Sequence, residues 1–453
     1  MNLSVIILAA GQGTRMKSSL PKVMHRIAGI PMLEHVYRRS LELGADDIHV
    51  VYGHGGEHLR ETCSDFDVDW VLQQAQLGTA HAVQQASPKI NSESTVLVLY
   101  GDVPLIKTET LRALIEKVSD NNIALLTVDL DEPAGYGRIV RDNGKVISIV
   151  EHKDASEDQR QIKEVNTGIL AMRAGYLNEC LSKIDNNNSQ GEYYLTDIIA
   201  LAVADGNAVF TAQPENSYEV EGVNDRKQLA RLERIHQCEM VEKIMLQGVT
   251  VADPARVDIR GEIKIGKDSF IDINTIFEGN VEIGCNVVIG AGCVISNCKI
   301  GDGCNIKPYS VVESAVIEKN VDVGPFARLR PGTHLLDNSK VGNFVEIKNT
   351  FLGEGSKVSH LSYLGDSEIG RDVNIGAGTI TCNYDGANKH KTIIKDGAFI
   401  GSDTQLVAPV TIGKDATIGA GSTITKDTDD DSLTLSRTVQ KTIKGWQRPT
   451  KKK

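Results

Sequence analysis

The sequence lacks features that mark several common classes of protein. No apolar run approaches the length needed to cross a membrane, and the longest one near the start is Val5 to Ala10. That segment has neither a basic flank nor a cleavage site, so we expect a buried strand rather than a signal peptide. We therefore expect a cytoplasmic protein with no membrane partner.

Cysteine pairs, an excess of basic charge and the best-known phosphate motifs are also missing. The eight cysteines include no CxxC pair, which argues against a zinc ribbon or a thioredoxin-type site. Sixty acidic residues against 49 basic ones give a formal charge of −11, which argues against broad binding of nucleic acid. Neither the Walker pattern nor the dinucleotide GxGxxG occurs. Any anionic substrate must therefore be bound by local clusters of basic side chains.

What the sequence does contain is a series of aliphatic residues that recur every six positions. An α-helix has a period of 3.6 residues and an ordinary strand a period of 2, so neither explains this spacing. A coil of three flat faces with one hexapeptide per face does explain it, and we predict a parallel β-helix over roughly residues 250–426. The aliphatic residues expected to point inward are Ile283, Ile289, Ile295; Ile300, Ile306, Val312; Ile317, Val323, Leu329, Leu335, Val341, Ile347; and Ile394, Ile400, Leu406, Ile412, Ile418, Ile424.

Two kinds of small residue recur in this register. Glycines directly follow several inward aliphatics, where we expect the backbone to turn a corner; they are Gly284, Gly290, Gly301, Gly413 and Gly419. Cys293 and Cys304 follow an inward aliphatic by four positions, a place for small buried side chains. We interpret these two cysteines as packing residues rather than metal ligands.

The first half of the chain alternates between strand-like and helix-like segments. Helices are predicted over Met32–Leu43 and Leu111–Asn121, and a long helix is predicted from an N-cap at Asp225 to Gly248. This alternation predicts a mostly parallel sheet covered on both sides, with ligands bound beyond the carboxyl ends of its strands. The predicted strands are Leu3–Ala10, Ile48–Tyr52, Val68–Leu72, Val96–Tyr100 and Ile123–Val128.

The loop after the first predicted strand is suited to phosphate. Gly11 and Gly13 let the backbone approach a phosphate chain, and Arg15 and Lys22 can neutralise its oxygens. A GxG by itself also fits many ordinary turns between a strand and a helix. The longer string that runs to Leu20-Pro21-Lys22 is more specific.

Two further loops at strand ends carry candidate ligands. Gln73, Gln76, Gly78 and Thr79 could read the edge of a nucleobase, although an ordinary polar loop would look the same. Asp102 follows a buried strand and could hold a hard cation or serve only as a turn residue.

The hexapeptide register also places outward residues together. Arg330 and Lys348 should stack one coil apart, about 4.8 Å from each other, either as a phosphate site or as solvated surface charges. A loop with the residues Thr381 to Lys389 interrupts the repeats, and such an excursion is a place to look for binding. A second row along one edge should contain His360, Ala377, Ser402 and Ala420, and its length suits an extended pantetheine arm.

These motifs carry a resemblance that covers nearly the whole chain, from Leu8 to Arg437. Residues 1–226 resemble the sugar-1-phosphate nucleotidyltransferases. With the hexapeptide region and the string Ser359 to Asp366, the chain resembles the bacterial bifunctional family of N-acetylglucosamine-1-phosphate uridylyltransferase / glucosamine-1-phosphate acetyltransferase. The resemblance implies an α/β, Rossmann-like nucleotidyltransferase domain (1–226), a linker helix (227–247), and a left-handed parallel β-helix acetyltransferase domain with a basic tail (248–453).

The resemblance also implies roles for residues in the first domain. UTP and the UDP-sugar would be contacted by Leu8, Ala9, Ala10, Gly11, Lys22, Gln73, Gly78, Thr79, Tyr100, Gly101, Asp102, Gly137, Glu151, Asn166 and Asn224. Arg15 and Lys22 would assist catalysis, and Asp102 and Asn224 would hold Mg²⁺ as the cofactor. Family members often carry a basic residue at the position of Gln12, so we expect altered affinity for the phosphates here.

In the second domain the resemblance implies that His360 is the general base. The sugar phosphate, glucosamine-1-phosphate, would be held by Arg330, Lys348, Tyr363, Asn374 and Lys389. Acetyl-CoA would be contacted by Ala377, Asn383, Tyr384, Ser402, Ala420 and Arg437. The product would be UDP-N-acetylglucosamine, a precursor of peptidoglycan and lipopolysaccharide, and the implied assembly is a homotrimer.

Three alternatives stay open on the sequence. The β-helix could be only regulatory, as in ADP-glucose pyrophosphorylases, or the whole chain could be a non-catalytic assembly subunit like those of a translation exchange factor. His360 and the Arg330/Lys348 pair argue against the first alternative, and retention of Asp102 argues against the second. Within the acetyltransferase hypothesis, Cys382 could instead carry the acyl group covalently.

Overall fold

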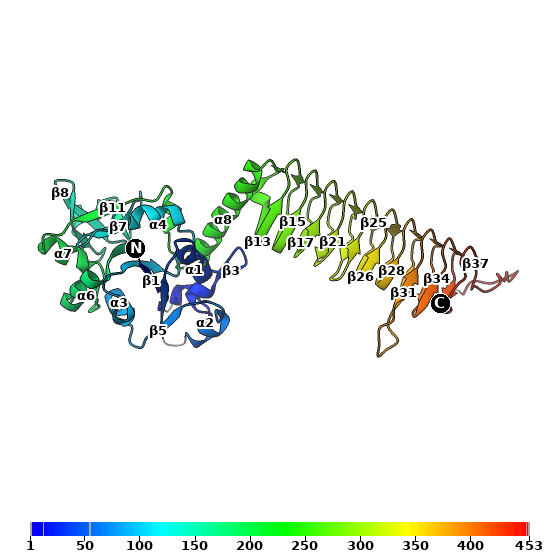
Figure 1. The fold of residues 1–453 in the computed structure, drawn as a ribbon, viewed down its shortest axis with the longest axis horizontal. Coiled ribbons are helices and arrows are strands. Elements are labelled where there is room, and N and C mark those ends of the chain that lie inside the picture. Colours follow the sequence, from blue (N-terminus) through cyan, green and yellow to red (C-terminus); the bar gives the residue numbers. More distant parts are fainter. Residues whose placement is uncertain (1, 12, 54–55, 450, 452–453) are drawn as a thin grey trace. The chain divides into compact units, whose positions relative to one another are not determined.

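The computed structural model describes the chain except for residues 1, 12, 54–55, 450 and 452–453 (Figure 1). It divides into two compact units, Met1–His236 and Gln237–Lys453. Helix α8 (Arg226–Leu246) begins in the first unit and ends in the second. Within the described part of the chain, no helix is both long and apolar enough to cross a membrane. The expectation about Gln12 falls outside the described residues.

The first unit is built on a nine-stranded sheet that is mostly parallel, as predicted. Strand β1 (Leu3–Leu8) pairs in parallel with β4 (Asp47–Gly53) and β6 (Thr95–Tyr100). The long strand β10 (Glu164–Arg173) runs antiparallel between β6 and β7 (Ile123–Asp129). The short strands β8 (Arg138–Asp142) and β9 (Lys145–Val150) form an antiparallel pair beside β10. In spatial order the main strands are β11 (Val209–Ala212), β7 (Ile123–Asp129), β10 (Glu164–Arg173), β6 (Thr95–Tyr100), β1 (Leu3–Leu8), β4 (Asp47–Gly53) and β5 (Asp69–Gln73).

Both faces of this sheet are buried under helices, which confirms the expected layering. Along β1, Val5 and Ile7 belong to one apolar cluster, with residues of α1 and α4. Ile6 and Leu8 belong to another cluster, with residues of α3, α6 and α7. Alternate side chains of a strand point to opposite faces, so an all-apolar strand is expected between two helical layers. The helices are α1 (Met32–Glu42), α2 (Glu57–Thr62), α3 (Thr79–Ala86), α4 (Thr108–Ile115), α5 (Glu157–Arg160), α6 (Ala174–Lys183) and α7 (Asp197–Ala204).

The helix predicted over Leu111–Asn121 was wrong at both ends, because α4 spans Thr108–Ile115. Its start is polar but buried, since the hydroxyl of Thr110 donates to Glu219 at 2.6 Å. After its last residue the chain turns: the amide of Val118 donates to the carbonyl oxygen of Ile115 at 2.9 Å, and the side-chain oxygen of Asn122 accepts from the amide of Ser119 at 2.7 Å. The first contact joins residues 109 positions apart, so the local pattern could not reveal it.

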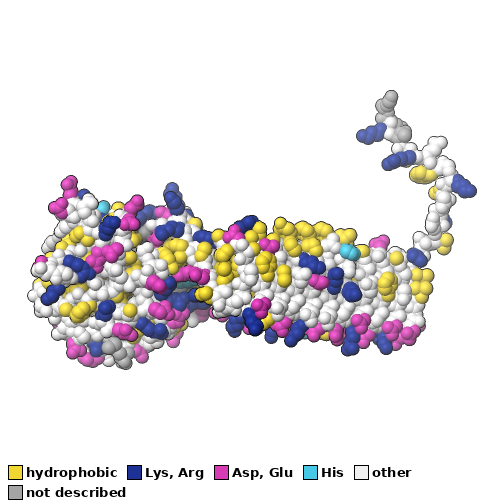
Figure 2. Space-filling view, turned by 90° about the horizontal axis from the view of Figure 1, so that it is seen from above, with side chains coloured by type: hydrophobic (Ala, Val, Ile, Leu, Met, Phe, Trp, Pro, Cys, Tyr) yellow, Lys and Arg dark blue, Asp and Glu magenta, His cyan; other side chains and the backbone are white. Residues whose placement is uncertain are grey.

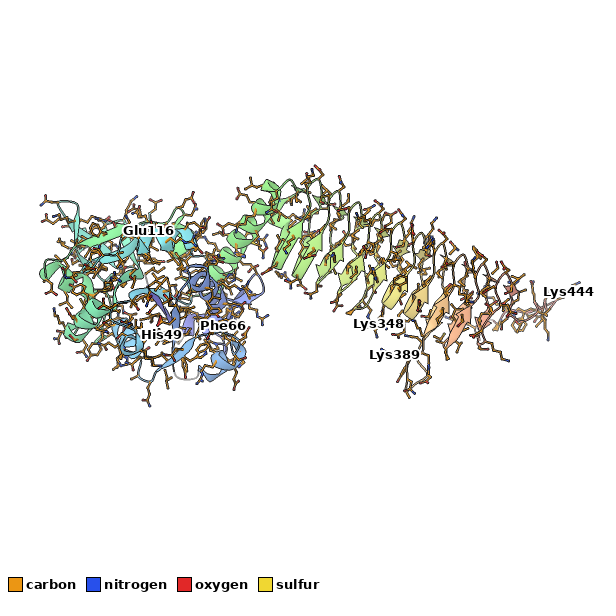
Figure 3. All side chains as sticks on the ribbon, in the orientation of Figure 1. His49, Phe66, Glu116, Lys348, Lys389 and Lys444 are labelled. Carbon is orange, nitrogen blue, oxygen red and sulfur yellow. The ribbon has the colours of Figure 1, made fainter. Side chains whose placement is uncertain are left out.

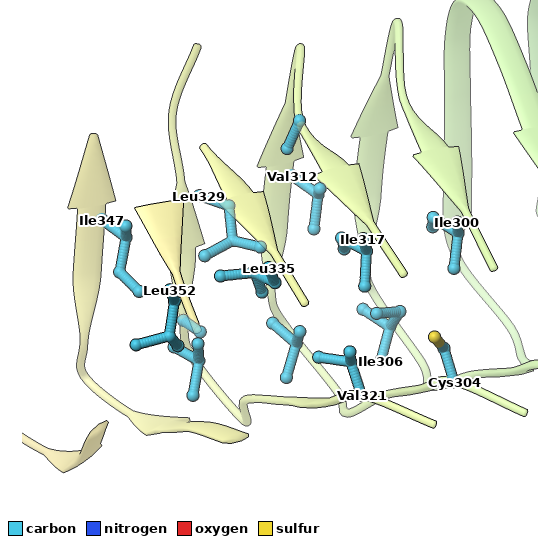
Figure 4. Close-up of a cluster of buried hydrophobic side chains, with 14 of the residues drawn as sticks. Ile300, Cys304, Ile306, Val312, Ile317, Val321, Leu329, Leu335, Ile347 and Leu352 are labelled. Carbon is cyan, nitrogen blue, oxygen red and sulfur yellow. The ribbon is translucent and has the colours of Figure 1, made fainter. Parts of the chain in front are cut away.

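The second unit is a parallel β-helix, as the six-residue period predicts. All 18 residues expected to point inward are buried in one continuous core. Figure 4 shows the part of this core around Ile317 and Leu335. Long strands such as β15 (Thr275–Ile283) pair with β17 through Ile276–Glu278 and with β18 through Glu282–Ile283, so they continue from one face to the next. Successive coils are held together by parallel backbone pairing, which leaves the inward aliphatics stacked on their equivalents.

The strands of the β-helix fall into three faces. One face contains β12 (Thr250–Val251), β14 (Phe270–Ile271), β16 (Val288–Ile289), β19 (Asn305–Ile306), β22 (Asp322–Val323), β25 (Lys340–Asn343), β27 (Lys357–His360), β29 (Asn374–Ile375), β32 (Phe399–Ile400), β35 (Thr417–Ile418) and β37 (Leu433–Thr434). The second contains β17 (Val294–Ser296), β20 (Val311–Glu313), β23 (Arg328–Leu329), β30 (Ile380–Cys382), β33 (Gln405–Val407) and β36 (Thr423–Ile424). The third contains β18 (Lys299–Ile300), β21 (Val316–Ile317), β24 (His334–Leu335), β31 (Thr392–Ile394) and β34 (Val410–Ile412), while β13 (Val257–Ile265), β15, β26 (Glu346–Leu352) and β28 (Tyr363–Ile369) are shared by the last two faces.

The glycines that follow inward aliphatics are needed for space rather than for a left-handed turn. A Cβ on Gly290 would lie 2.7 Å from the backbone nitrogen of Pro308 on the next coil. A Cβ on Gly301 would likewise lie 2.8 Å from the backbone carbonyl carbon of Glu318 on the next coil. Each glycine directly follows the last residue of a strand, as expected for a corner, and neither has a positive φ. Close stacking of the coils excludes a side chain there.

The cysteines of the repeats are packing residues. Cys293 and Cys304 are buried in the core, and the thiol of Cys304 donates to the carbonyl oxygen of Glu318 at 2.8 Å. Burial raises the pKa of each of these two thiols to about 11. The thiols therefore stay protonated near neutral pH, which suits packing.

Candidate active sites

The carboxyl ends of β1, β5 and β6 border a cavity of about 480 Å³ in the first unit. Ten of the residues predicted to contact the nucleotide line it: Leu8, Ala9, Ala10, Gly11, Lys22, Gln73, Gly78, Thr79, Tyr100 and Asp102. Sequence reasoning missed Glu192, which also lines the cavity but lies far along the chain with no motif around it. A cavity at this edge of a parallel sheet is the usual position of a ligand in such folds.

Two smaller cavities share residues with the first. One of about 390 Å³ shares Tyr100 and Asp102 and is also lined by Arg15 and Asn224. Another of about 100 Å³ shares Thr79 and Tyr100 and is also lined by Glu151 and Asn166. Tyr100 borders all three cavities, so the predicted nucleotide, metal and sugar residues surround one connected region.

Two of the residues predicted to contact the nucleotide or the sugar, Gly101 and Gly137, lie next to residues that line these cavities. The carbonyl oxygen of Gly137 accepts from the amide of Asn166 at 2.9 Å, and a Cβ on Gly137 would lie 3.3 Å from Oε1 of Glu151. Gly101 is buried, and its amide donates to the carbonyl oxygen of Leu8 at 2.9 Å. Each glycine therefore allows neighbouring segments to approach closely, and neither lines any of these three cavities.

The charged centre of this region joins three distant parts of the chain. The ammonium group of Lys22 forms an ion pair with Asp102 and lies 3.4 Å from Oδ1 of Asn224. A guanidinium nitrogen of Arg15 donates to the same Oδ1 at 2.9 Å. Two hard oxygen ligands thus converge on one cationic group, and the donor set is that which Mg²⁺ prefers when substrate phosphates and waters supply the rest. The residues present fit a divalent cation.

Burial raises the pKa of two carboxyl groups in this part of the first unit. Burial raises the pKa of Glu151, a hydrogen bond from the hydroxyl of Thr196 at 3.2 Å opposes this shift, and the charge of Asp154 adds to it. Burial, with the nearby charges of Asp185, Glu151 and Asp154, raises the pKa of Asp197 to about 6. Carboxyl groups of this kind are suited to hydrogen bonds with sugar hydroxyls, which both donate and accept.

In the second unit, the predicted row along one edge of the β-helix is continuous. The amide of Gly378 donates to the carbonyl oxygen of His360 at 3.3 Å, and that of Asp403 donates to Ala377 at 2.7 Å. The amide of Gly421 donates to the carbonyl oxygen of Ser402 at 2.8 Å, and a guanidinium nitrogen of Arg437 donates to that of Ala420 at 3.0 Å. The row therefore runs from the imidazole to Arg437, with small side chains between them.

Sequence reasoning missed the residue that orients the imidazole. Asn343 pairs with His360 in parallel register one coil earlier, and its Oδ1 lies 2.6 Å from Nδ1 of the ring. An amide oxygen only accepts, so Nδ1 carries the hydrogen and Nε2 keeps its lone pair. The spacing of 17 positions before His360 was the signal in the sequence that could have found Asn343.

Three of the predicted sugar-phosphate residues form a cationic cluster. Leu329 pairs with Ile347, so Arg330 and Lys348 lie side by side on neighbouring coils. The ammonium group of Lys389 and, more weakly, the guanidinium of Arg330 lower the pKa of Lys348 (Figure 3). Arg330 is paired with Glu346 at 2.8 Å. Cations that repel one another in the free protein form a site that an anion would stabilise.

The remaining predicted residues divide between this cluster and other faces. A Cβ on Gly365 would meet both the hydroxyl of Tyr363 and Nδ2 of Asn383, the latter at 2.8 Å, so these two side chains lie together. Tyr384 is exposed on the outward loop, and its hydroxyl donates to Gly386 at 2.6 Å.

Asn374 lies on another face, in register with Lys357 and Phe399, and does not join the cluster within one chain. Burial raises the pKa of Cys382, which disfavours the nucleophilic thiolate.

Comparison with known families gives matches in both units. Residues 5–156 match the MobA-like NTP transferase domain, residues 259–335 match the GMPPB C-terminal domain, and residues 391–426 match six bacterial transferase hexapeptide repeats. The chain therefore carries a nucleotidyltransferase domain followed by hexapeptide transferase repeats.

Two solved structures align with about half of the chain. A nucleotidyl transferase from Methanothermobacter thermautotroptrophicus aligns with 51% of this chain and 96% of its own, at 19% identity and a TM-score of 0.39. A UDP-glucose pyrophosphorylase complexed with UDP-glucose aligns with 52% of this chain and 98% of its own, at 16% identity and a TM-score of 0.42.

Proposed function

We propose that the protein is a bifunctional enzyme that makes UDP-N-acetylglucosamine. The β-helix unit would transfer the acetyl group of acetyl-CoA to glucosamine-1-phosphate, and the first unit would transfer UMP from UTP to the product. The observation that carries the proposal is the unbroken row from His360 to Arg437, which begins at an imidazole oriented by Asn343. A β-helix that only regulated the first unit would not need an oriented base beside such a row.

The proposed acetyl transfer follows from the geometry of His360. Because Nδ1 donates to Asn343, Nε2 is free to take a proton from the amino group of glucosamine-1-phosphate as its nitrogen attacks the thioester carbonyl carbon. The carbon–sulfur bond then breaks, and the proton held on Nε2 of His360 passes to the sulfur, which leaves as the thiol of CoA. The cluster of Arg330, Lys348 and Lys389 supports binding of the phosphate, since a dianion relieves their mutual repulsion.

The proposed UMP transfer is an in-line displacement. A phosphate oxygen of N-acetylglucosamine-1-phosphate attacks the α-phosphorus of UTP, and pyrophosphate leaves. Arg15 and Lys22 lie where they can stabilise the charge on the phosphates, and Asp102 and Asn224 would hold Mg²⁺. When bound, Mg²⁺ would neutralise phosphate oxygens and orient them for the displacement. Lys22 would exchange its ion pair with Asp102 for a phosphate oxygen.

A homotrimer with acetyltransferase sites between neighbouring chains is part of the proposal. Asn374 lies on a different face from the cationic cluster, so these predicted ligands would meet one sugar phosphate only if two chains supplied them. An exposed apolar row next to His360 supports contact with another copy. It contains Tyr309, Phe326, Phe344 and Leu361, and Figure 2 shows hydrophobic side chains gathered along the β-helix.

The proposal is tested by assaying each reaction separately. The purified protein receives glucosamine-1-phosphate with acetyl-CoA, and release of free thiol is followed. In parallel it receives N-acetylglucosamine-1-phosphate with UTP and Mg²⁺, and pyrophosphate is followed. We expect both activities, and we expect EDTA to abolish only the second. Absence of thiol release would leave the β-helix as a regulatory unit, and absence of both reactions would favour an assembly subunit.

A further inference from the structure

A partly buried contact beside the nucleotide cavity links Gln73, at the end of β5, to His81 on α3. Gln73 lines the cavity but is only 3% exposed. Its Nε2 lies 3.2 Å from the carbonyl oxygen of Gly78 and 3.0 Å from Nδ1 of His81. Both contacts involve the same amide nitrogen, so they fix the orientation of the side chain.

The chemistry of these neighbours determines which amide atom faces which group. A carbonyl oxygen only accepts hydrogen bonds, so the amide atom that faces Gly78 is the nitrogen. Its second hydrogen then points to Nδ1 of His81, which must accept it and is therefore unprotonated. The contact of Gln85 with Nε2 of the ring is longer, at 3.3 Å, and that amide also donates to the carbonyl oxygen of His81 at 3.1 Å. Gln73 is thus the better-anchored partner of the ring.

The arrangement leaves one polar atom of Gln73 for a ligand. Both hydrogens of its amide are used by Gly78 and His81, whereas Oε1 accepts no hydrogen bond from any described residue. Because Gln73 lines the cavity, the cavity presents a hydrogen-bond acceptor at this point. Uracil offers a donor at N3, whereas N3 of cytosine is itself an acceptor and would face Oε1 lone pair to lone pair.

We propose that His81 is a positioning residue that determines nucleobase specificity: it holds Gln73 with its oxygen toward the cavity, so that uracil is accepted and cytosine rejected. The inference rests on the proposed transfer of UMP. A site that presents a fixed acceptor rejects a mismatched base more strongly than a site whose amide can rotate, because a freely rotating amide can offer its nitrogen to cytosine. Loss of the imidazole acceptor leaves only Gly78 to hold the amide.

Two substitutions at His81 separate its acceptor role from its bulk. His81→Phe keeps a ring of similar size and removes the acceptor, whereas His81→Asn places an amide oxygen near the position of Nδ1. The measured quantity is the ratio of kcat/KM for UTP to that for CTP. We expect His81→Phe to lower this ratio about tenfold or more, and His81→Asn to stay within about threefold of the wild type.

The control for general loss of stability is His49→Phe, which changes a buried histidine of strand β4 in the same unit (Figure 3). His49 contacts Asp47 and Asp69 at 3.2 Å each, at the end of β4 opposite to Gly53. We expect this variant to keep the UTP to CTP ratio even if it is less stable. An unchanged ratio in His81→Phe, or an equal fall of the ratio in His81→Asn, overturns the inference.

Direct calorimetric titration with UTP and with CTP distinguishes failure of this inference from failure of the proposed function. If the wild type transfers no UMP, the proposed function fails, but the two affinities still test His81. A wild type that binds UTP more tightly, with the preference reduced in His81→Phe and kept in His81→Asn, supports the inference. A wild type that binds the two nucleotides equally, or neither of them, contradicts it.

Discussion

His360 and Asn343 occupy equivalent positions on consecutive coils, and Nδ1 of the imidazole lies 2.6 Å from the amide oxygen of Asn343. This contact fixes one tautomer of the ring, with the lone pair on Nε2. The parallel register of the β-helix brings the two residues together, so the fold itself supplies both the base and the group that orients it.

Replacement of Asn343 tests this relationship. Asn343→Leu removes the acceptor while keeping a side chain of similar size, so the imidazole loses its fixed tautomer. We expect kcat for acetyl transfer to fall about tenfold to a hundredfold, as for loss of other groups that orient a catalytic base. Transfer of UMP, measured on the same preparation, should be unchanged. Asn305→Leu, an asparagine on the same face of the β-helix, should leave both rates unaltered.

The cationic cluster predicts an unusual link between stability and binding. Lys348 faces like charges, so Lys348→Met should not lower Tm at low ionic strength. The same change should raise KM for glucosamine-1-phosphate about tenfold or more, because a charge-assisted hydrogen bond is lost. Inorganic phosphate should raise the Tm of the wild type more than that of the variant. Lys357→Met is the matched control, and an equal effect of phosphate on all three proteins would contradict the account.

Acid should destabilise the first unit through His35. The pKa of His35 is lowered to about 4, mainly by burial and in smaller part by the charges of His236, Arg39 and Arg38. A hydrogen bond to the carbonyl oxygen of Ile27 at 2.9 Å opposes the shift. Below the ordinary value of about 6.5 the unfolded chain binds a proton that the folded protein does not. Stability from this group is therefore complete above pH 6.5 and falls by about 3 kcal/mol as the pH drops to 4.

The raised pKa of Asp197 changes the stability in the opposite direction between about pH 4 and 6. The contribution of His35 is therefore measured by comparing the wild type with a variant at position 35. His35→Gln keeps a donor for Ile27 and cannot titrate. Urea unfolding is followed by the fluorescence of Trp70, in a Trp446→Phe background. The wild type should lose more unfolding free energy between pH 7 and pH 4 than His35→Gln does. The exposed His58→Gln should behave as the wild type, and equal pH dependence in all three would refute the assignment.

The repeats made the second unit largely predictable from the sequence. Steps of five or six residues between inward aliphatics determine which side chains point inward and which outward residues share an edge. The row from His360 to Ala420 therefore followed from counting, once the interruption between Ile375 and Ile394 was allowed for. The same count could have identified Asn343. It also places Asn374 on the face of Lys357 and Phe399, away from the cationic cluster with which the resemblance groups it.

The first unit was less predictable because its decisive contacts are long-range. Helix α1 and the parallel strands β1, β4, β5, β6 and β7 followed from their apolar patterns, but the bounds of α4 and the antiparallel β10 did not. Lys22 meets Asp102 across 80 positions and Asn224 across 202. The pairing of Gln73 with His81 is short in sequence, but it depends on how β5 and α3 approach each other. Neither the composition nor the spacing of apolar residues shows how two such elements pack against each other.

The most direct test of the account uses one mixture with glucosamine-1-phosphate, acetyl-CoA, UTP and Mg²⁺. The wild type should form UDP-N-acetylglucosamine. Asp102→Ala should stop at N-acetylglucosamine-1-phosphate, whereas His360→Ala should consume no glucosamine-1-phosphate yet form the UDP-sugar when N-acetylglucosamine-1-phosphate is supplied. A mixture of the two variants should restore the full conversion. If either single change abolished both reactions, or if neither abolished one, the assignment of two separate sites would be contradicted.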